Sequence, residues 1–458
     1  MAIDNIIWLK DLDKNKTDIA GVKGAYLSDL YNNGFPVPNG FIISTDAFKE
    51  FLHSNNLDAE IKKIMKNLNH ENQEEVSRAF EKIKGIIGKE KISPVLESEI
   101  LEAYENLNID EELLRVSGNV LSLIKRGRSN AIVAVRSSSV SDIPGCCSNF
   151  LNIIGTKNLM NSIKECWSSL YNAGNILSRK KNNAENFIAV IVQKMADINK
   201  SGVILSSNPM NREREIIVEA NFGLGQLVTR GEVTPDLYIL DSEFKIKKEI
   251  IGKKKLKLIR DVNTNENVRK KLIEEENKKV MQNWELEDAA RLAQKIERIY
   301  NKPVAVEFGI GKKIIIFHAR LFNLPEIIDK DNLKGEVLVE GKGASPKISS
   351  GIVDKTVFVN DVADSRILEN LSNLKGVVVN QGSLGSCFAI LCRQHNIPFV
   401  IAENSTALLI HGLLITVDGV NGRVYKGEAK EKEEIIKKVE IQYVKEEPES
   451  YGFEILEL

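Results

Sequence analysis

Cys387 stands where a short run of valines gives way, through a glycine-containing turn, to a predicted helix. The valines, residues 377–379, indicate a buried parallel strand, and residues 388–394 have the apolar spacing of a helix whose first turn holds Ser386 and Cys387. Free N–H groups at the start of a helix favour an anion and lower the pKa of a thiol, so this pattern suits phosphate chemistry or a nucleophilic thiolate. A free cysteine is also a common apolar core residue, and position alone leaves both interpretations open.

Two basic residues in small, polar surroundings are further candidates for phosphate contacts. Lys23 lies between Gly21 and Gly24, so both backbone and ammonium group can approach a phosphate closely. Arg136 ends a predicted strand at a serine-rich loop, and residues 143–147 continue as a turn that could close over a triphosphate. A guanidinium group matches phosphate oxygens well, although a salt bridge at a strand end would place an arginine in the same way.

Carboxylates occur in two further patterns. Glu219 precedes a glycine-rich turn into a helix. Glu307 and Arg320 lie on a predicted hairpin formed by residues 303–308 and 313–320, where alternate residues face the same side. A carboxylate near an arginine can serve Mg²⁺ and a terminal phosphate, or it can be an ordinary surface ion pair.

Length and composition limit the class of protein. The chain has 458 residues, which at roughly 150 residues per domain suggests about three domains. Its formal net charge of -1 lacks the basic excess of a nucleic-acid-binding protein. The N-terminus has no signal-peptide pattern and no stretch of about 18 apolar residues occurs, so we expect a cytoplasmic protein without membrane contact. The five cysteines form no paired Cys-x-x-Cys sets, and reduced thiols are expected.

Periodicity predicts the elements that must position these side chains. Residues 59–87 and 94–107 are predicted to be long helices. Residues 187–195 and 201–207 are predicted to be paired strands. Residues 284–300 carry the apolar stripe of a helix packed on a sheet. The first two thirds of the chain is therefore expected to be α+β.

The remaining segments divide the chain. The basic run at residues 245–271 is interpreted as the solvated face of an antiparallel hairpin in preference to a phosphate site. The polar residues 323–334, which include Pro325, are predicted to be a linker. Residues 335–427 have the composition of a compact α/β module, and the last thirty residues are a charged extension.

Several motifs, taken together and in order, resemble the nucleotide-binding half of the pyruvate phosphate dikinase and phosphoenolpyruvate synthase family. They are found at residues 21–27, 34–45, 133–138, 192–195, 201–209, 231–236, 306–308 and 318–320. The resemblance implies an ATP-grasp fold with an N-terminal lobe at residues 1–190 and a C-terminal lobe at residues 191–322. Two α+β lobes of this kind clamp ATP between them.

The segment after the linker is similar to the swivelling phosphohistidine domain of the same family. The similarity lies in residues 341–351, 376–382, 395–401 and 417–425. It implies a multidomain α/β and α+β protein with a linker at 323–334, a swivelling domain at 335–430 and an extension at 431–458. Such a domain carries a phosphoryl group on a histidine to a barrel domain that binds pyruvate. The chain contains no segment long enough for that barrel, so a separate substrate-domain protein or an unknown small-molecule acceptor is the expected partner.

The resemblance also implies roles for individual residues. Three basic residues are implied to contact the phosphates of ATP: Lys23, Arg136 and Arg320. Three others are implied to line the adenine hinge: Gln193, Lys194 and Met195. Glu219 is implied to meet the ribose or a nearby loop, and Glu307 to hold Mg²⁺.

Three positions depart from the family pattern. Ala305 stands where an aspartate is usual, and His318 stands where a glutamine near the second metal contact is usual. Because Mg²⁺ prefers oxygen ligands, His318 is a poor substitute and the metal site is expected to be altered. Cys387 replaces the carrier histidine. His395, about two turns along the same helix, is expected to face solvent.

Two functional classes remain open from the sequence. The first is an ATP-dependent phosphotransferase in which Lys23 and Arg136 assist transfer and Cys387 accepts the phosphoryl group, or in which transfer goes directly to a bound substrate. The second is a nucleotide-binding regulatory or scaffold protein derived from a dikinase. Both require ATP binding, so binding alone does not separate them.

Overall fold

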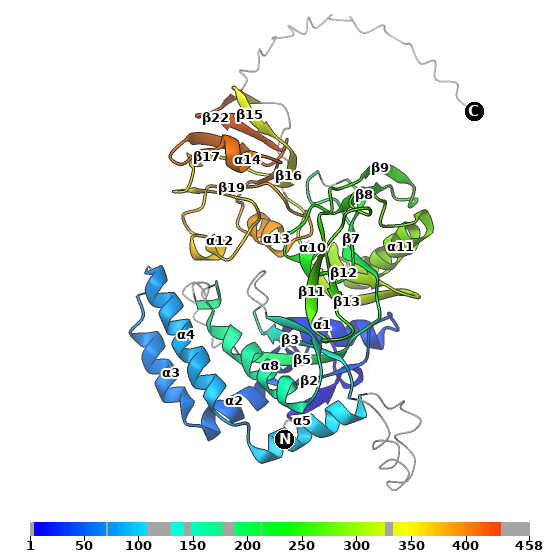
Figure 1. Cartoon of the computed structure of the whole chain (residues 1–458), viewed down its shortest axis with the longest axis vertical. Coiled ribbons are helices and arrows are strands. Elements are labelled where there is room, and N and C mark those ends of the chain that lie inside the picture. The colour runs from blue at the N-terminus through cyan, green and yellow to red at the C-terminus, as the bar shows by residue number, and fades with distance from the viewer. Residues whose placement is uncertain are drawn as a thin grey trace, which may run out of the picture.

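The computed structural model shows two α+β lobes and a compact C-terminal unit (Figure 1). It describes residues 4–69, 72–107, 130–141, 148–172, 174–176, 187–211, 213–325 and 333–431. The turn predicted at residues 143–147 lies outside these residues. So do most of the predicted linker and all but the first residue of the predicted extension at 431–458.

The first lobe is built on a five-stranded antiparallel sheet with the order β1-β2-β5-β3-β4. Its strands are β1 (Ile6–Trp8), β2 (Gly40–Ile43), β3 (Val133–Ser139), β4 (Asn149–Ile153) and β5 (Ile188–Lys194). The boundary predicted at residue 190 falls inside β5, so this sheet extends to Lys194.

Helices enclose an aromatic core on one side of this sheet. They are α2 (Thr45–Ser54), α3 (Leu57–Lys66), α4 (Gln73–Lys89), α5 (Pro94–Asn106) and α8 (Thr156–Ser168). The rings of Phe48 and Phe51 pack on Trp167 at centroid distances of 5.6 and 4.8 Å. The single helix predicted over residues 59–87 is wrong. It is divided into α3 and α4 because Asn72 caps a new helix by accepting from the backbone N–H groups of Glu74 and Glu75.

The second lobe contains a six-stranded antiparallel sheet with the order β13-β12-β6-β7-β8-β9. Its strands are β6 (Lys200–Leu205), β7 (Ile216–Phe222), β8 (Asp236–Leu240), β9 (Ile246–Ile250), β12 (Val304–Ile310) and β13 (Ile314–Leu321). The predicted pairing of β5 with β6 is wrong. Each strand already has two neighbours in its own sheet, so neither has an edge left for the other.

Helix α1 (Thr17–Asn32) packs against the first sheet and against β13, and so joins the two lobes. Helix α11 (Asn283–Tyr300) confirms the predicted amphipathic helix and covers β6, β7 and β12. The short helix α10 (Gln226–Thr229) follows β7. The predicted β12–β13 hairpin is also confirmed.

The basic run forms a hairpin of β10 (Leu256–Arg260) and β11 (Asn267–Lys271), as predicted. Its interpretation as a wholly solvated face is wrong at Lys254, which is fully buried. The Lys254 ammonium lies 2.5 Å from the carboxylate of Asp236, which is buried as well. Burial of both charges together explains why a lysine can occupy this position.

The C-terminal unit, residues 333–431, is made of two four-stranded sheets. One contains β15 (Val337–Glu340), β17 (Ile348–Ile352), β21 (Leu414–Asp418) and β22 (Arg423–Lys426); the other contains β16 (Lys342–Ser345), β18 (Val357–Asn360), β19 (Gly376–Val379) and β20 (Phe399–Ile401). A two-residue pairing of β14 (Leu333–Lys334) with β23 (Lys430–Glu431) closes its ends. Strand β19 is buried and parallel to both neighbours, which confirms the prediction from the valine run.

Helix α13 (Cys387–Gln394) begins where the sequence placed it, with the Ser386 hydroxyl accepting from the Ala389 backbone N–H. The shorter helices α12 (Arg366–Glu369) and α14 (Ser405–Leu408) complete the unit. The predicted multidomain α/β and α+β class is therefore confirmed. None of the helices in the described ranges has the length and apolar character needed to span a membrane.

Candidate functional site

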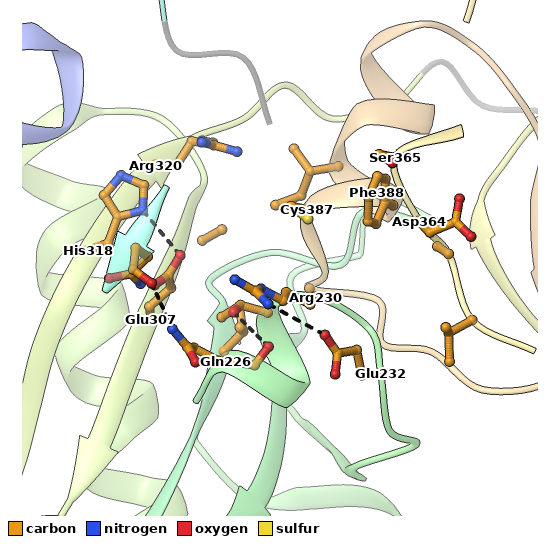
Figure 2. A pocket seen from close by; sticks show the side chains of 18 of the residues that line it. Gln226, Arg230, Glu232, Glu307, His318, Arg320, Asp364, Ser365, Cys387 and Phe388 are labelled. Carbon is orange, nitrogen blue, oxygen red and sulfur yellow. Dashed lines mark hydrogen bonds and ion pairs between the residues drawn. The ribbon is translucent and has the colours of Figure 1, made fainter. Parts of the chain in front are cut away.

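A cavity of about 750 Å³ is lined by residues of both lobes and the C-terminal unit (Figure 2). Its lining includes six of the predicted site residues: Lys23, Arg136, Glu307, His318, Arg320 and Cys387. They come from α1, β3, β12, β13 and α13, elements that are far apart in the sequence. The structure therefore brings together basic groups, a carboxylate, an imidazole and a thiol in one chamber.

Lys23 is positioned by a break in α1. Gly21 has φ 66° and ψ 167° inside the helix, a combination that is essentially restricted to glycine. A Cβ atom at Gly21 would lie 2.0 Å from the Ser138 carbonyl oxygen. The Ser138 hydroxyl accepts from the Gly24 N–H and donates to the Ala20 carbonyl, so β3 holds both sides of the break. The glycine that the sequence suggested for phosphate approach thus also permits close helix-to-strand packing.

Arg136 and Glu307 form the polar floor of the cavity. The Arg136 Nη1 donates to the Phe317 carbonyl at 2.5 Å, and its Nη2 lies 3.3 Å from the Glu307 Oε2. The other Glu307 oxygen lies 3.4 Å from the His318 Nδ1. Arg136 is thereby fixed by one backbone and one carboxylate contact, both from the second lobe.

The ionisation of these groups follows from their surroundings. Burial opposes the charge on Glu307, but His318, Arg136 and Lys23 outweigh it and hold the pKa of this carboxyl well below its usual range. Burial lowers the pKa of His318, and the attraction of Glu307 compensates only in part. Glu307 is therefore ionised and His318 neutral near pH 7, so their contact is a hydrogen bond to a carboxylate more than an ion pair.

Strand pairing places each of the two residues that depart from the family pattern, His318 and Ala305, opposite a residue that follows it. Glu307 is opposite His318 and Ala305 is opposite Arg320 in the β12–β13 ladder. His318 and Arg320 are two residues apart on β13, and Figure 2 shows both beside the cavity. The small Ala305 side chain lines the cavity and supplies no ligand atom.

The predicted adenine-hinge residues line a smaller hollow next to the cavity. Gln193, Lys194 and Met195 share this hollow with Arg136 and Glu307, which also face the main cavity. The buried Gln193 amide donates to the Pro38 carbonyl at 3.1 Å, whereas the Lys194 side chain is exposed. Apolar side chains of the same hollow give a planar ring a suitable surface.

Cys387 reaches the cavity from the start of α13, but its surroundings oppose the thiolate that the start of a helix would favour. Burial raises the pKa of the Cys387 thiol to about 11, and the positive charges of Arg320 and Arg230 offset this only partly. The side chain is half-buried and packs against apolar residues of the interface. The cost of removing a thiolate from water thus exceeds what the helix start and nearby arginines supply.

Glu219 does not line the cavity. Its Oε1 accepts from the Leu384 N–H at 2.9 Å, and its Oε2 accepts from the Ser383 hydroxyl and the Gly385 N–H, both at 2.7 Å. The carboxylate therefore meets a loop of the C-terminal unit, just before α13. Of the two implied contacts, the ribose and a nearby loop, these bonds correspond to a loop.

The sequence prediction missed many of the residues that line the cavity, and four polar ones among them lie close to its basic groups. They are Gln226, Arg230, Glu232 and Arg269. Glu232 lies between the two arginines, 3.7 Å from Arg230 and 2.6 Å from Arg269. Arg230 and Glu232 lie in or beside the motif at residues 231–236, and Arg269 lies in the basic run. Both segments were noted in the sequence, but nothing in it indicated that they meet at the cavity.

The oxygen donors of the site suit Mg²⁺ only in part. Across the described ranges, no group of three or more His, Cys, Asp or Glu side chains is arranged to hold a metal ion. Mg²⁺ commonly takes one or two carboxylates and completes its shell with phosphate oxygens and water. Glu307 fits that pattern as a single protein ligand, whereas the nitrogen of His318 does not.

Family comparisons agree with this arrangement. Residues 17–324 match the model described as "Pyruvate phosphate dikinase, AMP/ATP-binding domain", and residues 352–422 match "PEP-utilising enzyme, mobile domain". The chain belongs to the pyruvate phosphate dikinase and phosphoenolpyruvate synthase family. Its AMP/ATP-binding domain contains Lys23, Arg136, Glu307, His318 and Arg320, and its mobile domain contains Cys387.

Curated relatives cover nearly the whole chain. The chain is 32% identical over 463 residues to a probable phosphoenolpyruvate synthase of Archaeoglobus fulgidus, covering 94% of this chain and 59% of the relative. It is 29% identical to that of Methanothermobacter thermautotrophicus, with 92% and 63% covered. It is 30% identical to the phosphoenolpyruvate synthase of Pyrococcus furiosus, with 93% and 59% covered. The chain thus spans about three fifths of the length of these family members.

Proposed function

We propose that this protein is an ATP-dependent phosphotransferase that binds ATP in the cavity between its lobes and its mobile domain. The observation that carries the proposal is the meeting of Lys23, Arg136, Glu307 and Arg320 with Cys387 in a single cavity. In this proposal the lobes at residues 4–194 and 200–321 form an ATP-grasp nucleotide site, and residues 333–431 form the swivelling domain.

The chain's own residues would divide the work of binding. Lys23, Arg136 and Arg320 supply positive charge where phosphate oxygens would lie, and Arg136 is pre-oriented by Glu307 and the Phe317 carbonyl. Gln193, Lys194 and Met195 would line the adenine site. Glu307 would hold Mg²⁺, which when bound neutralises charge on the transferring phosphates.

Cys387 is the proposed phosphoryl acceptor. Its sulfur would form a bond to phosphorus while the bond from phosphorus to the leaving oxygen of the nucleotide breaks. The thiol proton must leave before or during this step, and neutral His318 in the same cavity is a base that can take it. The phosphoryl group would then pass to a small metabolite or to a separate substrate-domain protein.

One observation favours a second function. The raised pKa of Cys387 leaves very little thiolate near pH 7, which suits a nucleotide-binding regulatory or scaffold protein in which no covalent transfer occurs. In that case ATP would occupy the cavity and act only by stabilising one arrangement of the domains.

The experiment that separates these functions follows radiolabel from ATP onto the full chain. Of two separate incubations, with β- and with γ-labelled ATP and Mg²⁺, one should leave label on the wild type, according to which phosphoryl group is transferred. Neither should label Cys387→Ser, whereas Cys392→Ala on the same helix should keep the label. The labelled peptide should contain Cys387 and lose its label on mild hydrolysis. If the wild type binds ATP but neither takes up label nor turns ATP over, the phosphotransferase is refuted and the regulatory function is supported. The phosphotransferase is also refuted if ATP turnover is the same in Lys23→Ala as in the wild type.

A further inference from the structure

Glu219 makes the most concentrated polar contact between the AMP/ATP-binding domain and the mobile domain that the structure describes. It lies on β7, its side chain is almost completely buried, and both of its oxygens accept hydrogen bonds. The three donors are consecutive in the chain: Ser383, Leu384 and Gly385. A carboxylate bound by adjacent backbone N–H groups and a hydroxyl is a recurrent way of holding an anion in a turn.

The charge of Glu219 is matched from the mobile domain. Arg393 and Lys342 both belong to that domain, and burial lowers the pKa of each while Glu219 acts to raise it. The Arg393 Nη1 also donates to the carbonyl of Leu384 at 2.9 Å and to that of Ala344 at 2.7 Å. Arg393 thereby fixes the same loop whose N–H groups face Glu219, so the loop is preformed to receive a carboxylate.

The surrounding surfaces fit closely. A Cβ atom at Gly385 would lie 2.7 Å from a Val203 methyl group, and one at Gly231 would lie 3.2 Å from the Ser386 Cβ. One apolar cluster continues across the contact, with Val203, Leu227 and Val233 on one side and Leu384, Phe388 and Ala389 on the other. A side chain at Gly385 would force the two surfaces apart, and one at Gly231 would be tight, so the contact is specific in shape as well as in charge.

We propose that Glu219 is a docking residue, a carboxylate latch that captures the 383–385 loop of the mobile domain and thereby holds the start of α13 at the nucleotide cavity. Cys387 lies two residues beyond Gly385, so the latch positions its side chain without touching a reacting atom. The family resemblance implied that Glu219 meets the ribose or a nearby loop, and the latch is a contact of the second kind. Its consequence for transfer rests on the proposed function, whereas docking itself requires neither nucleotide nor a reactive Cys387.

The Glu219→Gln variant tests the latch with almost no change in shape. A carboxylate presents acceptors to both backbone N–H groups, but an amide must turn its own NH₂ toward either Leu384 or Gly385, donor against donor. Hydrogen exchange of the full-length protein, read by mass spectrometry, should show faster exchange for the peptide containing Leu384 and Gly385. We expect an increase of about tenfold or more, because each hydrogen bond to a charged group corresponds to roughly a factor of ten.

Three controls make the result specific. Exchange in β19, inside the mobile domain, should stay unchanged, which distinguishes undocking from unfolding. Lys253→Met removes an exposed ion pair with Glu403 that also joins the two domains, at 3.0 Å, and should leave exchange at residues 384–385 within about twofold of the wild type. Ser383→Ala removes one latch bond from the opposite side and should give a smaller increase at the same peptide.

The outcomes are distinguishable from those for phosphoryl transfer. Faster exchange at residues 384–385 in Glu219→Gln, with β19 and ATP affinity preserved, supports the latch even if Cys387 never accepts label. Unchanged exchange there would overturn it. Weaker ATP binding with unchanged exchange would also overturn it and would assign Glu219 to the nucleotide instead. If Glu219→Gln does not fold, unchanged exchange in Ser383→Ala would count against the latch in the same way.

Discussion

Gly21→Ala should be among the most damaging single-methyl substitutions in the first lobe. Gly21 combines φ 66° with ψ 167°, and the added methyl carbon would start 2.0 Å from the Ser138 carbonyl oxygen. An alanine held in this backbone region costs about 2 kcal/mol. Relief of the clash requires α1 and β3 to move apart by about 1 Å, because real Cβ atoms approach no closer than about 3 Å.

That separation breaks the contacts that fix Lys23. The Ser138 hydroxyl bonds to Gly24 and Ala20 would both be lost, at about 1 kcal/mol each, so the free energy of unfolding should fall by about 4 kcal/mol in total. Because Lys23 lies between these contacts and the cavity, ATP affinity should fall as well. Gly34→Ala is the matched control. Gly34 also has positive φ, 75°, but a Cβ there meets nothing within 4 Å, so only a backbone cost of about 1 kcal/mol is expected.

Urea unfolding followed by tryptophan fluorescence measures both variants. Trp8 and the buried Trp167 lie in the first lobe, whereas Trp284 on α11 is already 60% exposed, so the change in signal mainly reports unfolding of the first lobe. ATP titration of the folded variants reports the cavity. If Gly21→Ala loses no more stability than Gly34→Ala, the close approach to Ser138 does not determine the position of α1. Unchanged ATP affinity in Gly21→Ala would show that Lys23 is not placed by this break.

Two further predictions concern buried ionisable groups. The rate of alkylation of Cys387, followed by peptide mass spectrometry, should rise about tenfold per pH unit from pH 7 to near 11. The reason is that the thiolate is the reacting form and the pKa of the thiol is raised to about 11. An alkylation rate that levels off below pH 9 would contradict this. Lys254→Met should lower the free energy of unfolding by about 3–5 kcal/mol because it leaves the buried Asp236 carboxylate without its cation. Lys253→Met is the control and should lower it by less than about 1 kcal/mol, since its ion pair is exposed. Equal losses of stability in thermal unfolding would show that burial is not the cause.

Local patterns in the sequence were sufficient for elements whose stabilising contacts are also local. The apolar spacing of α11, the hairpin of β12 and β13 and the start of α13 each depend on a few neighbouring residues, and all three were predicted. The valine run of β19 was predicted for the same reason, because burial on both faces leaves a continuous apolar signature.

The features that the sequence did not reveal depend on contacts between residues that are distant in the chain. Lys254 is buried because Asp236, 18 residues earlier, supplies its counter-charge, and no periodicity records that pairing. Glu219 meets a loop more than 160 residues later, so the sequence, which left the ribose and a nearby loop as alternatives, could not specify that loop. The sequence left two interpretations of Cys387 open because a helix start is visible in the sequence, whereas the packing that raises the pKa of the thiol is not.

The three positions that depart from the family pattern are not scattered. Ala305, His318 and Cys387 all line the one cavity, together with the retained Lys23, Arg136 and Arg320. A chain that had merely lost nucleotide chemistry would have no physical reason to keep Arg136 fixed by two contacts or to keep Glu307 ionised. In the proposed site, the changes fall on the positions assigned to the metal and the acceptor, while the basic groups assigned to the phosphates are the usual ones. This separation is expected of a site that still binds the nucleotide polyphosphate and has altered what happens at its end, which is the reason to test the fate of the label before testing affinity.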